Sequence, residues 1–178
     1  PQVAEETLSP ILPSSRLYGP ARSLIGQALF QRMLRYQEKN ASDQAADLAP
    51  RIAKYHQEAL QHSLTEKESQ ISNYQAGYTL YQNNQFNEVL PFWENYLESA
   101  EPSKETEDIR YRVATIHQSQ QNWLQAEQRY GEYATSSLDL PEENKAQATF
   151  WWGEVAFQRA AEQLEASSNS GTLESTFV

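Results

Sequence analysis

The chain has 178 residues, of which 39% are hydrophobic and 11% aromatic, and this is enough apolar material to build a folded core. Its net charge of −10 disfavours binding to nucleic acid, because the chain repels phosphate backbones, and it favours a basic partner. The absence of cysteine excludes disulfides, thiol nucleophiles and cysteine-ligated metals. No apolar run approaches the roughly 18 residues of a membrane helix, so we expect no direct membrane span.

The amino-terminal third predicts an arm followed by a pair of helices. Residues 1–19 contain three prolines and lack helical periodicity, so we expect an extended arm. The chain begins with Pro1 rather than methionine, which suggests that a preceding segment was removed or not included. Residues 20–62 predict a degenerate helical hairpin that is broken at residues 40–43. Its second helix is expected to be capped by Asp47, with Pro50 in the first turn.

Helix-start signals continue through residues 63–166. Thr65-x-x-Glu68 is a capping box, and Ser103 is a second expected cap. Turns are expected at residues 83–85 and 120–122. Residues 142–166 contain no turn residue and predict one long helix, followed by a tail over residues 167–178. The sequence therefore predicts an all-α protein of about seven helices without strands.

An internal repeat relates the helices of residues 63–166. A shift of 37 residues places Phe86 on Trp123, Val89 on Ala126 and Trp93 on Tyr130, and a further 39 residues place Ala114 on Gly153. The pattern Ala76-Gly77-x-x-Leu80, followed by Val89-x-x-x-Trp93, resembles a tetratricopeptide repeat. This resemblance covers about residues 66–166 and implies an α-solenoid of antiparallel helical hairpins. Four positions depart from the repeat pattern, namely Asn73, Arg110, His117 and Thr149.

The stretch "AQATFWWGEVAF" carries a second resemblance. It is similar to repeats of bacterial envelope proteins, namely the Tol-associated coordinator of cell-wall synthesis and the barrel-assembly lipoprotein. This similarity favours an extracytoplasmic, periplasmic location. For the same stretch, the resemblance to a tetratricopeptide repeat implies that Trp152 lies in the core and that Gly153 is the point of close helix contact. It also implies that Trp151 lies on another face of the helix. The long last helix would be a carboxy-terminal cap of the stack.

The resemblance also implies where a partner would bind. In tetratricopeptide stacks the first helix of each hairpin lines a concave groove. Tyr74, Tyr78 and Tyr81 share one helical stripe, and they lie either in this groove or in a core against the helix of residues 47–62. The candidate partner-binding residues are Tyr74, Tyr78, Tyr81, Tyr111, Phe150, Glu154 and Phe157.

Three functions remain open. The first is a non-catalytic scaffold or adaptor that binds a protein or peptide through this aromatic face. The second is a structural accessory subunit of a larger, membrane-associated complex, in which the arm and tail make the main contacts. The third is an enzyme or metal protein whose site is completed by another chain.

No motif in the sequence indicates catalysis. His56 and His62 are six residues apart and point to different sides of a helix, so they cannot share a metal ion. His117 occupies a core aromatic position and is expected to be a buried, hydrogen-bonded structural residue. The acidic clusters at helix starts are explained by the helix dipole. We therefore expect no enzyme activity, no cofactor and no metal.

Overall fold

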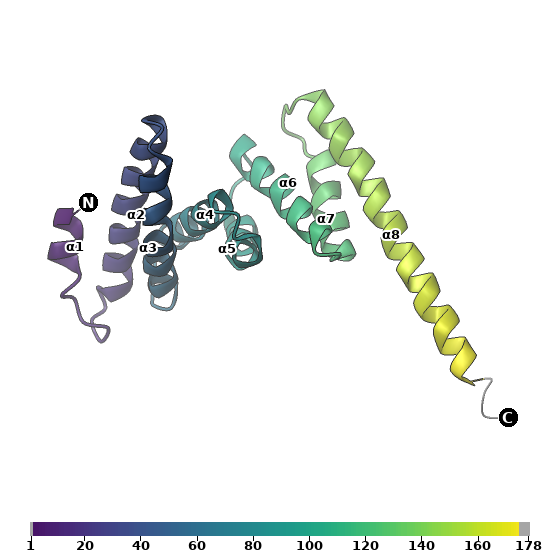
Figure 1. The fold of residues 1–178 in the computed structure, drawn as a ribbon, viewed down its shortest axis with the longest axis horizontal. Helices are drawn as coiled ribbons and strands as arrows, with labels where there is room; N and C mark the ends of the chain where they lie inside the picture. The colour runs from purple at the N-terminus through teal and green to yellow at the C-terminus, as the bar shows by residue number, and fades with distance from the viewer. Residues whose placement is uncertain (1, 175–178) are drawn as a thin grey trace. The chain divides into compact units, whose positions relative to one another are not determined.

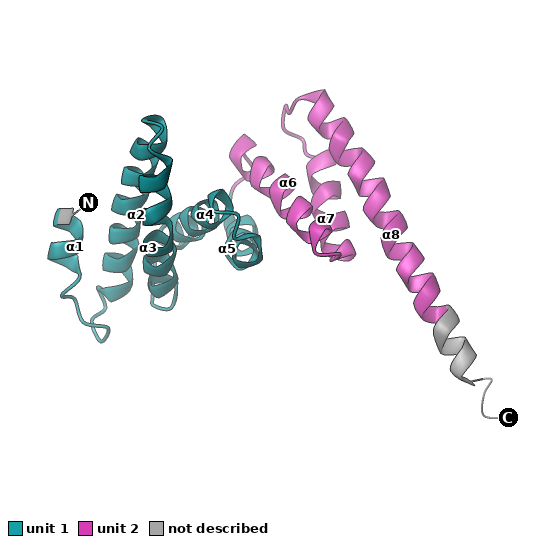
Figure 2. Ribbon diagram, viewed as in Figure 1, with its two compact units in different colours: residues 1–100 teal, residues 101–178 magenta. Residues whose placement is uncertain are grey.

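The computed structural model describes the backbone of residues 2–174 and the side chains of residues 3–167. In this part of the chain all regular secondary structure is α-helical (Figure 1). The chain divides into two compact units, residues 1–100 and residues 101–178 (Figure 2). The first unit holds α1 (Gln2–Leu8), α2 (Tyr18–Glu38), α3 (Ser42–Leu60), α4 (Glu66–Gln82) and α5 (Phe86–Ser99). The second unit holds α6 (Lys104–Ser119), α7 (Trp123–Ala134) and α8 (Glu142–Glu174).

The expectation of a fully extended arm over residues 1–19 is wrong, because residues 2–8 form α1. A helix of seven residues is too short to be stable alone. Here it is held by the first unit: Glu5 forms an ion pair with Arg51, and Leu8 packs against the core of α2 and α3. These contacts come from residues distant in sequence, so the local pattern did not reveal them.

Two helix boundaries also differ from the prediction. α3 begins at Ser42 rather than near Asp47, which leaves Pro50 inside the helix. Pro50 and Ala46, whose carbonyl loses its usual partner, are both exposed, so water can reach this break in the hydrogen-bond ladder. α8 continues beyond the expected end at Ala166 as far as Glu174. The last four residues of the expected tail lie outside the described residues.

The predicted helix starts at Thr65 and Ser103 are confirmed. The amide of Glu68 donates to Thr65 Oγ1 at 3.3 Å, and the amide of Thr65 donates to Glu68 Oε2 at 2.8 Å, which completes the capping box. The amide of Thr106 donates to Ser103 Oγ at 3.1 Å. These signals were readable because both partners of each cap lie within one helical turn.

Three turns share one backbone feature. Asn40, Asn84 and Gln121 have φ values of 54°, 58° and 60°, and they lie between α2 and α3, α4 and α5, and α6 and α7. A single residue in the left-handed region reverses the chain after a helix. In each case the two flanking helices pack against each other, so the described chain contains three helical hairpins.

The core of the first unit lies mainly between α2 and α3. It is built from aliphatic side chains and Phe30, and its buried members are Ile25, Leu29, Phe30, Met33, Ala45, Leu48 and Ile52. α4 packs on α3, and α5 packs on α4. Gly77 of α4 lets α5 approach closely, because a Cβ built on Gly77 would overlap the indole ring of Trp93. Trp93 is 1% exposed and therefore belongs to the core of this unit.

The core of the second unit joins α6, α7 and α8. Its buried members are Ala114, Ala126, Tyr130, Tyr133, Leu140, Ala148 and Val155, with Trp123 and Trp151 packed at its edge. Ala148 and Val155 are seven residues apart, so they mark the face of α8 that lies on α7. This face leaves the opposite side of α8 uncovered by any other described helix of its unit.

Candidate protein-binding site

The predicted tyrosine stripe of α4 is half-buried within the first unit. The rings of Tyr74 and Tyr78 lie 6.4 Å and 5.5 Å from the ring of Phe30, between ring centroids. Tyr81 packs on Trp93 at 5.1 Å. The three side chains thus contact α2 and α5, and only part of each is available to a partner.

Tyr111 of α6 also packs inside its own unit. Its ring lies 5.5 Å from Tyr130 and 5.3 Å from Tyr133, both on α7. The Tyr130 hydroxyl donates a 2.7 Å hydrogen bond to Gln118 Oε1. Burial raises the pKa of the Tyr111 and Tyr130 hydroxyls above the ordinary tyrosine value. This cluster ties α6 to α7 through neutral phenol groups.

The three predicted residues of α8 form a different kind of surface. Phe150 and Phe157 are 59% and 67% exposed, and Glu154 is exposed between them. Spacings of four and three residues place all three on one side of the helix. This side is opposite Ala148 and Val155. The structure therefore brings Phe150, Glu154 and Phe157 together on an open face.

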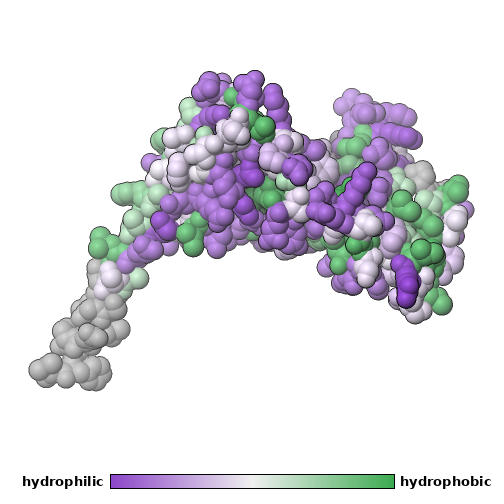
Figure 3. Space-filling view, turned by 180° about the vertical axis from the view of Figure 1, so that it is seen from behind, coloured by the Kyte–Doolittle hydropathy of each residue, from purple (hydrophilic) through white to green (hydrophobic). Residues whose placement is uncertain are grey.

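We call the surface formed by Phe150, Gly153, Glu154 and Phe157 the open face of α8. Apolar side chains, drawn in green, reach the surface along α8 next to its grey residues (Figure 3). Large exposed apolar groups on a common face are typical of protein contact sites. On the same side, Glu143, Glu154 and Glu165 follow one another at eleven-residue spacing, about three helical turns, and all three are exposed. The open face is therefore aromatic with an acidic edge.

The expectations for Trp152 and Gly153 are wrong. Trp152 is 37% exposed and lies over Gly131 of α7, where a Cβ would be 3.0 Å from its indole ring. A Cβ built on Gly153 would meet no atom within 4 Å. The equivalent residues Gly77 and Ala114 are buried because a second helix covers them. No described helix of the second unit covers Gly153.

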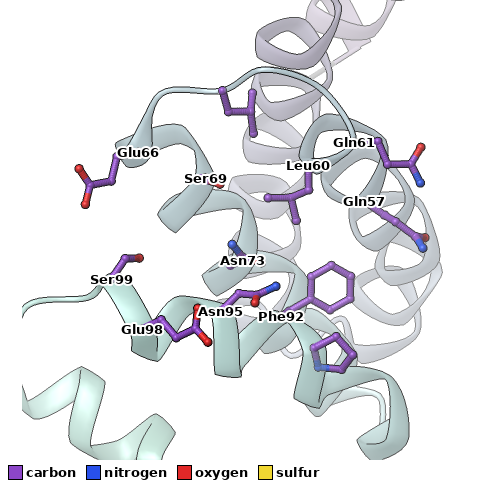
Figure 4. Close-up of a pocket in the computed structure, with 12 residues that line it drawn as sticks. Gln57, Leu60, Gln61, Glu66, Ser69, Asn73, Phe92, Asn95, Glu98 and Ser99 are labelled. Atoms are coloured by element: carbon purple, nitrogen blue, oxygen red, sulfur yellow. The ribbon is translucent and has the colours of Figure 1, made fainter.

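A groove in the first unit was not predicted from the sequence. It has a volume of about 640 Å³ and lies between α3, α4 and α5 (Figure 4). Side-chain amides line it, together with Leu60 and Phe92. Asn73 at its floor is 6% exposed, and its Oδ1 atom is buried without a hydrogen-bond partner. The signal was present in the sequence, since Asn73 stands where the repeat expects a large apolar residue.

The buried histidines contribute to packing. His56 is 0% exposed, lies against Gly26 and shares a 3.1 Å hydrogen bond between Nε2 and Gln75 Oε1. Desolvation by burial lowers its pKa to about 4, although the Gln75 bond acts in the opposite direction. His117 is 7% exposed, and its Nδ1 atom lies 3.5 Å from Asn122 Nδ2. Both features are expected for a buried, hydrogen-bonded structural histidine.

The described residues also bear on metal binding and on membrane insertion. Among them, no three histidine or acidic side chains are grouped so that they could hold a metal ion. Nor does any described helix combine the length and apolarity needed to cross a membrane. Comparison with family models, curated proteins and solved structures finds no match to this chain.

Proposed function

We propose that the chain is a non-catalytic protein-binding module of the tetratricopeptide type, which works as a scaffold or adaptor. The observation that carries this proposal is the pair of exposed phenylalanines, Phe150 and Phe157, on the open face of α8. Burial of two such rings in a complex is worth several kcal/mol, at about 25 cal/mol per Å² of apolar surface, which is enough to anchor an interface. The acidic edge of the open face disfavours a partner that places acidic groups opposite Glu143, Glu154 and Glu165.

The repeat supports the architecture in this proposal. Gly77 and Ala114, which the 37-residue shift aligns, both lie against an aromatic residue of the following helix, Trp93 in one case and Tyr130 in the other. A small residue opposite a large one is the contact expected in tetratricopeptide hairpins. The half-buried tyrosines of α4 would then serve mainly to join hairpins, and binding would rest on α8.

The proposal is tested by cross-linked pull-down from the native source followed by mass spectrometry. The bait is the full chain or its Phe150→Ser/Phe157→Ser variant. Because both rings are exposed, the variant should fold like the parent, which circular dichroism checks, but should lose the captured proteins. The matched control is Leu12→Ser/Leu17→Ser, which removes two side chains that are 68% and 63% exposed in the first unit.

The outcomes separate the functional alternatives. Partners lost only with the phenylalanine variant support binding through α8. A fixed ratio of membrane-complex subunits would identify an accessory subunit, whereas several substoichiometric partners would identify an adaptor. Identical capture by the parent and both variants would contradict the proposal.

A further inference from the structure

α4, α6 and α8 align with one another through the repeat, and two of them are followed by a packed second helix. Gly77 of α4 meets Trp93 of α5, and Ala114 of α6 lies in the core with Tyr130 of α7. Gly153 of α8 is the third aligned residue, and a Cβ there would meet nothing within 4 Å. The place of the second helix is thus open on α8.

The aromatic residues of the open face lead to the same conclusion. Phe150 aligns with Tyr74 and Tyr111, whose rings pack on Tyr96 of α5 at 5.6 Å and Tyr133 of α7 at 5.3 Å. Both equivalents of Phe150 therefore contact the second helix of their hairpin.

Phe157 behaves like Phe150. It aligns with Tyr81, which packs on Trp93 at 5.1 Å, and with Gln118, which accepts the 2.7 Å hydrogen bond from Tyr130. Phe150, Gly153 and Phe157 thus occupy positions that contact a second helix in the earlier hairpins, and no other described helix of the second unit covers them.

The chain itself does not turn back at the expected point. The earlier hairpins reverse at Asn84 and Gln121, both with positive φ. The aligned residue in α8 is Ala160, which is helical, and the helix continues for several turns to Glu174. The described residues that follow the open face therefore extend α8 and do not supply the second helix.

We propose that α8 is the first half of a hairpin whose second helix comes from another protein. This inference rests on the proposed function and specifies the class of partner. The partner segment is an amphipathic helix antiparallel to α8. Its pattern is that of α5 and α7, an apolar residue, then an aromatic residue four positions on and another three positions later, as in Val89-Trp93-Tyr96 and Ala126-Tyr130-Tyr133. Its first aromatic ring would lie on Gly153.

A second copy of the chain is a poorer occupant. If two α8 helices paired antiparallel about a twofold axis through their open faces, the acidic edge of one helix would lie beside the acidic edge of the other. Glu143, Glu154 and Glu165 would then face three identical carboxylates, which disfavours the pair. The helices α5 and α7 of a second copy are already covered by α4 and α6.

The test uses a labelled peptide of residues 122–136, the α7 segment, held helical by a lactam bridge between positions 124 and 128, which are exposed on α7. A second peptide carries Tyr130→Trp and a third carries Tyr130→Ala. Each is titrated with the full chain and followed by fluorescence anisotropy. The parent chain should bind the tyrosine and tryptophan peptides, and should bind the alanine peptide at least about tenfold more weakly.

Two protein variants make the test specific. Gly153→Ala should still bind the tyrosine peptide, because Ala114 accommodates Tyr130, but should bind the tryptophan peptide at least about tenfold more weakly. Gly153→Leu should lose both. Neither change disturbs folding contacts, since the space around Gly153 is empty, and circular dichroism verifies this.

Four results would overturn the inference. The first is that no peptide binds the parent chain, and the second is that the Gly153 variants bind all peptides as the parent does. The third is self-association of the parent, measured by analytical ultracentrifugation and abolished in Gly153→Leu, because it would identify a second copy as the occupant. Native partners that are retained by Gly153→Leu but lost by Phe150→Ser/Phe157→Ser would overturn the hairpin and leave the proposed function standing.

Discussion

At the scale of the residue, His56 makes folding sensitive to acid. It is fully buried and its pKa falls to about 4 in the folded chain, below the ordinary value of 6.5. The unfolded chain therefore binds a proton first as the pH falls. The contribution of neutral, buried His56 to the free energy of unfolding is fully present above pH 6.5. It decreases as the pH falls from 6.5 to about 4, by roughly 3 kcal/mol in total.

This predicts a difference between His56→Gln and a control variant of the same helix. Urea unfolding at several pH values should give a free energy of unfolding that falls between pH 6.5 and 4 in the parent chain. The fall should be smaller by roughly 3 kcal/mol in His56→Gln. Gln57→Ala changes an exposed residue next to His56 without removing a titratable group, so it is the control and should keep the parent slope. Equal slopes in all three proteins would show that His56 is not held neutral by burial.

Asn73 gives a second prediction at this scale. Its Oδ1 atom is buried without a partner beside the groove, which leaves room for a larger apolar side chain. Asn73→Leu should therefore raise the free energy of unfolding by about 1 kcal/mol. Asn95→Leu changes an exposed residue of the same groove and should stay within about 0.5 kcal/mol of the parent. A destabilised Asn73→Leu chain would mean that the amide has a role that packing does not explain.

At the scale of the element, the same substitution should have opposite effects in α4 and α8. Gly77→Ala forces a Cβ into the ring of Trp93 and should destabilise the chain by about 1–3 kcal/mol. Gly153→Ala meets no neighbour and should stabilise α8 by about 0.5–1 kcal/mol, because alanine is the better helix former. Thermal unfolding of both variants measures the two signs. Destabilisation by Gly153→Ala would mean that the open face is covered in the free protein.

Elements whose signals are local could be predicted. The capping box of Thr65 and Glu68 and the cap at Ser103 set helix starts correctly, since each uses residues one turn apart. α1 was missed because Arg51 and the α2–α3 core hold it. The predicted end of α8 is too early because the serines and the asparagine of residues 167–170 lower helix propensity by only some tenths of a kcal/mol each. Gly171 lowers it by about 1 kcal/mol, and the helix continues through it.

At the scale of the whole molecule, the helical class could be predicted, but the burial of Trp152 and Gly153 on α8 could not. The repeat aligned Gly153 with Gly77 and Ala114 correctly, yet burial depends on whether a second helix is present. Trp152 was placed in the core for the same reason. The site residues Phe150, Glu154 and Phe157 were selected by their place in the repeat, and the structure leaves them exposed.

The hairpins also bear on how the chain is made. α2 and α3, α4 and α5, and α6 and α7 pack as neighbours in sequence, so each pair can form soon after its second helix leaves the ribosome. The α7-facing side of α8 is covered in the same way. On the hairpin proposal its open face stays bare until a partner is met, so the free chain would be prone to aggregate when it is made in excess of its partner. Balanced synthesis of the two proteins would then matter as much as their affinity.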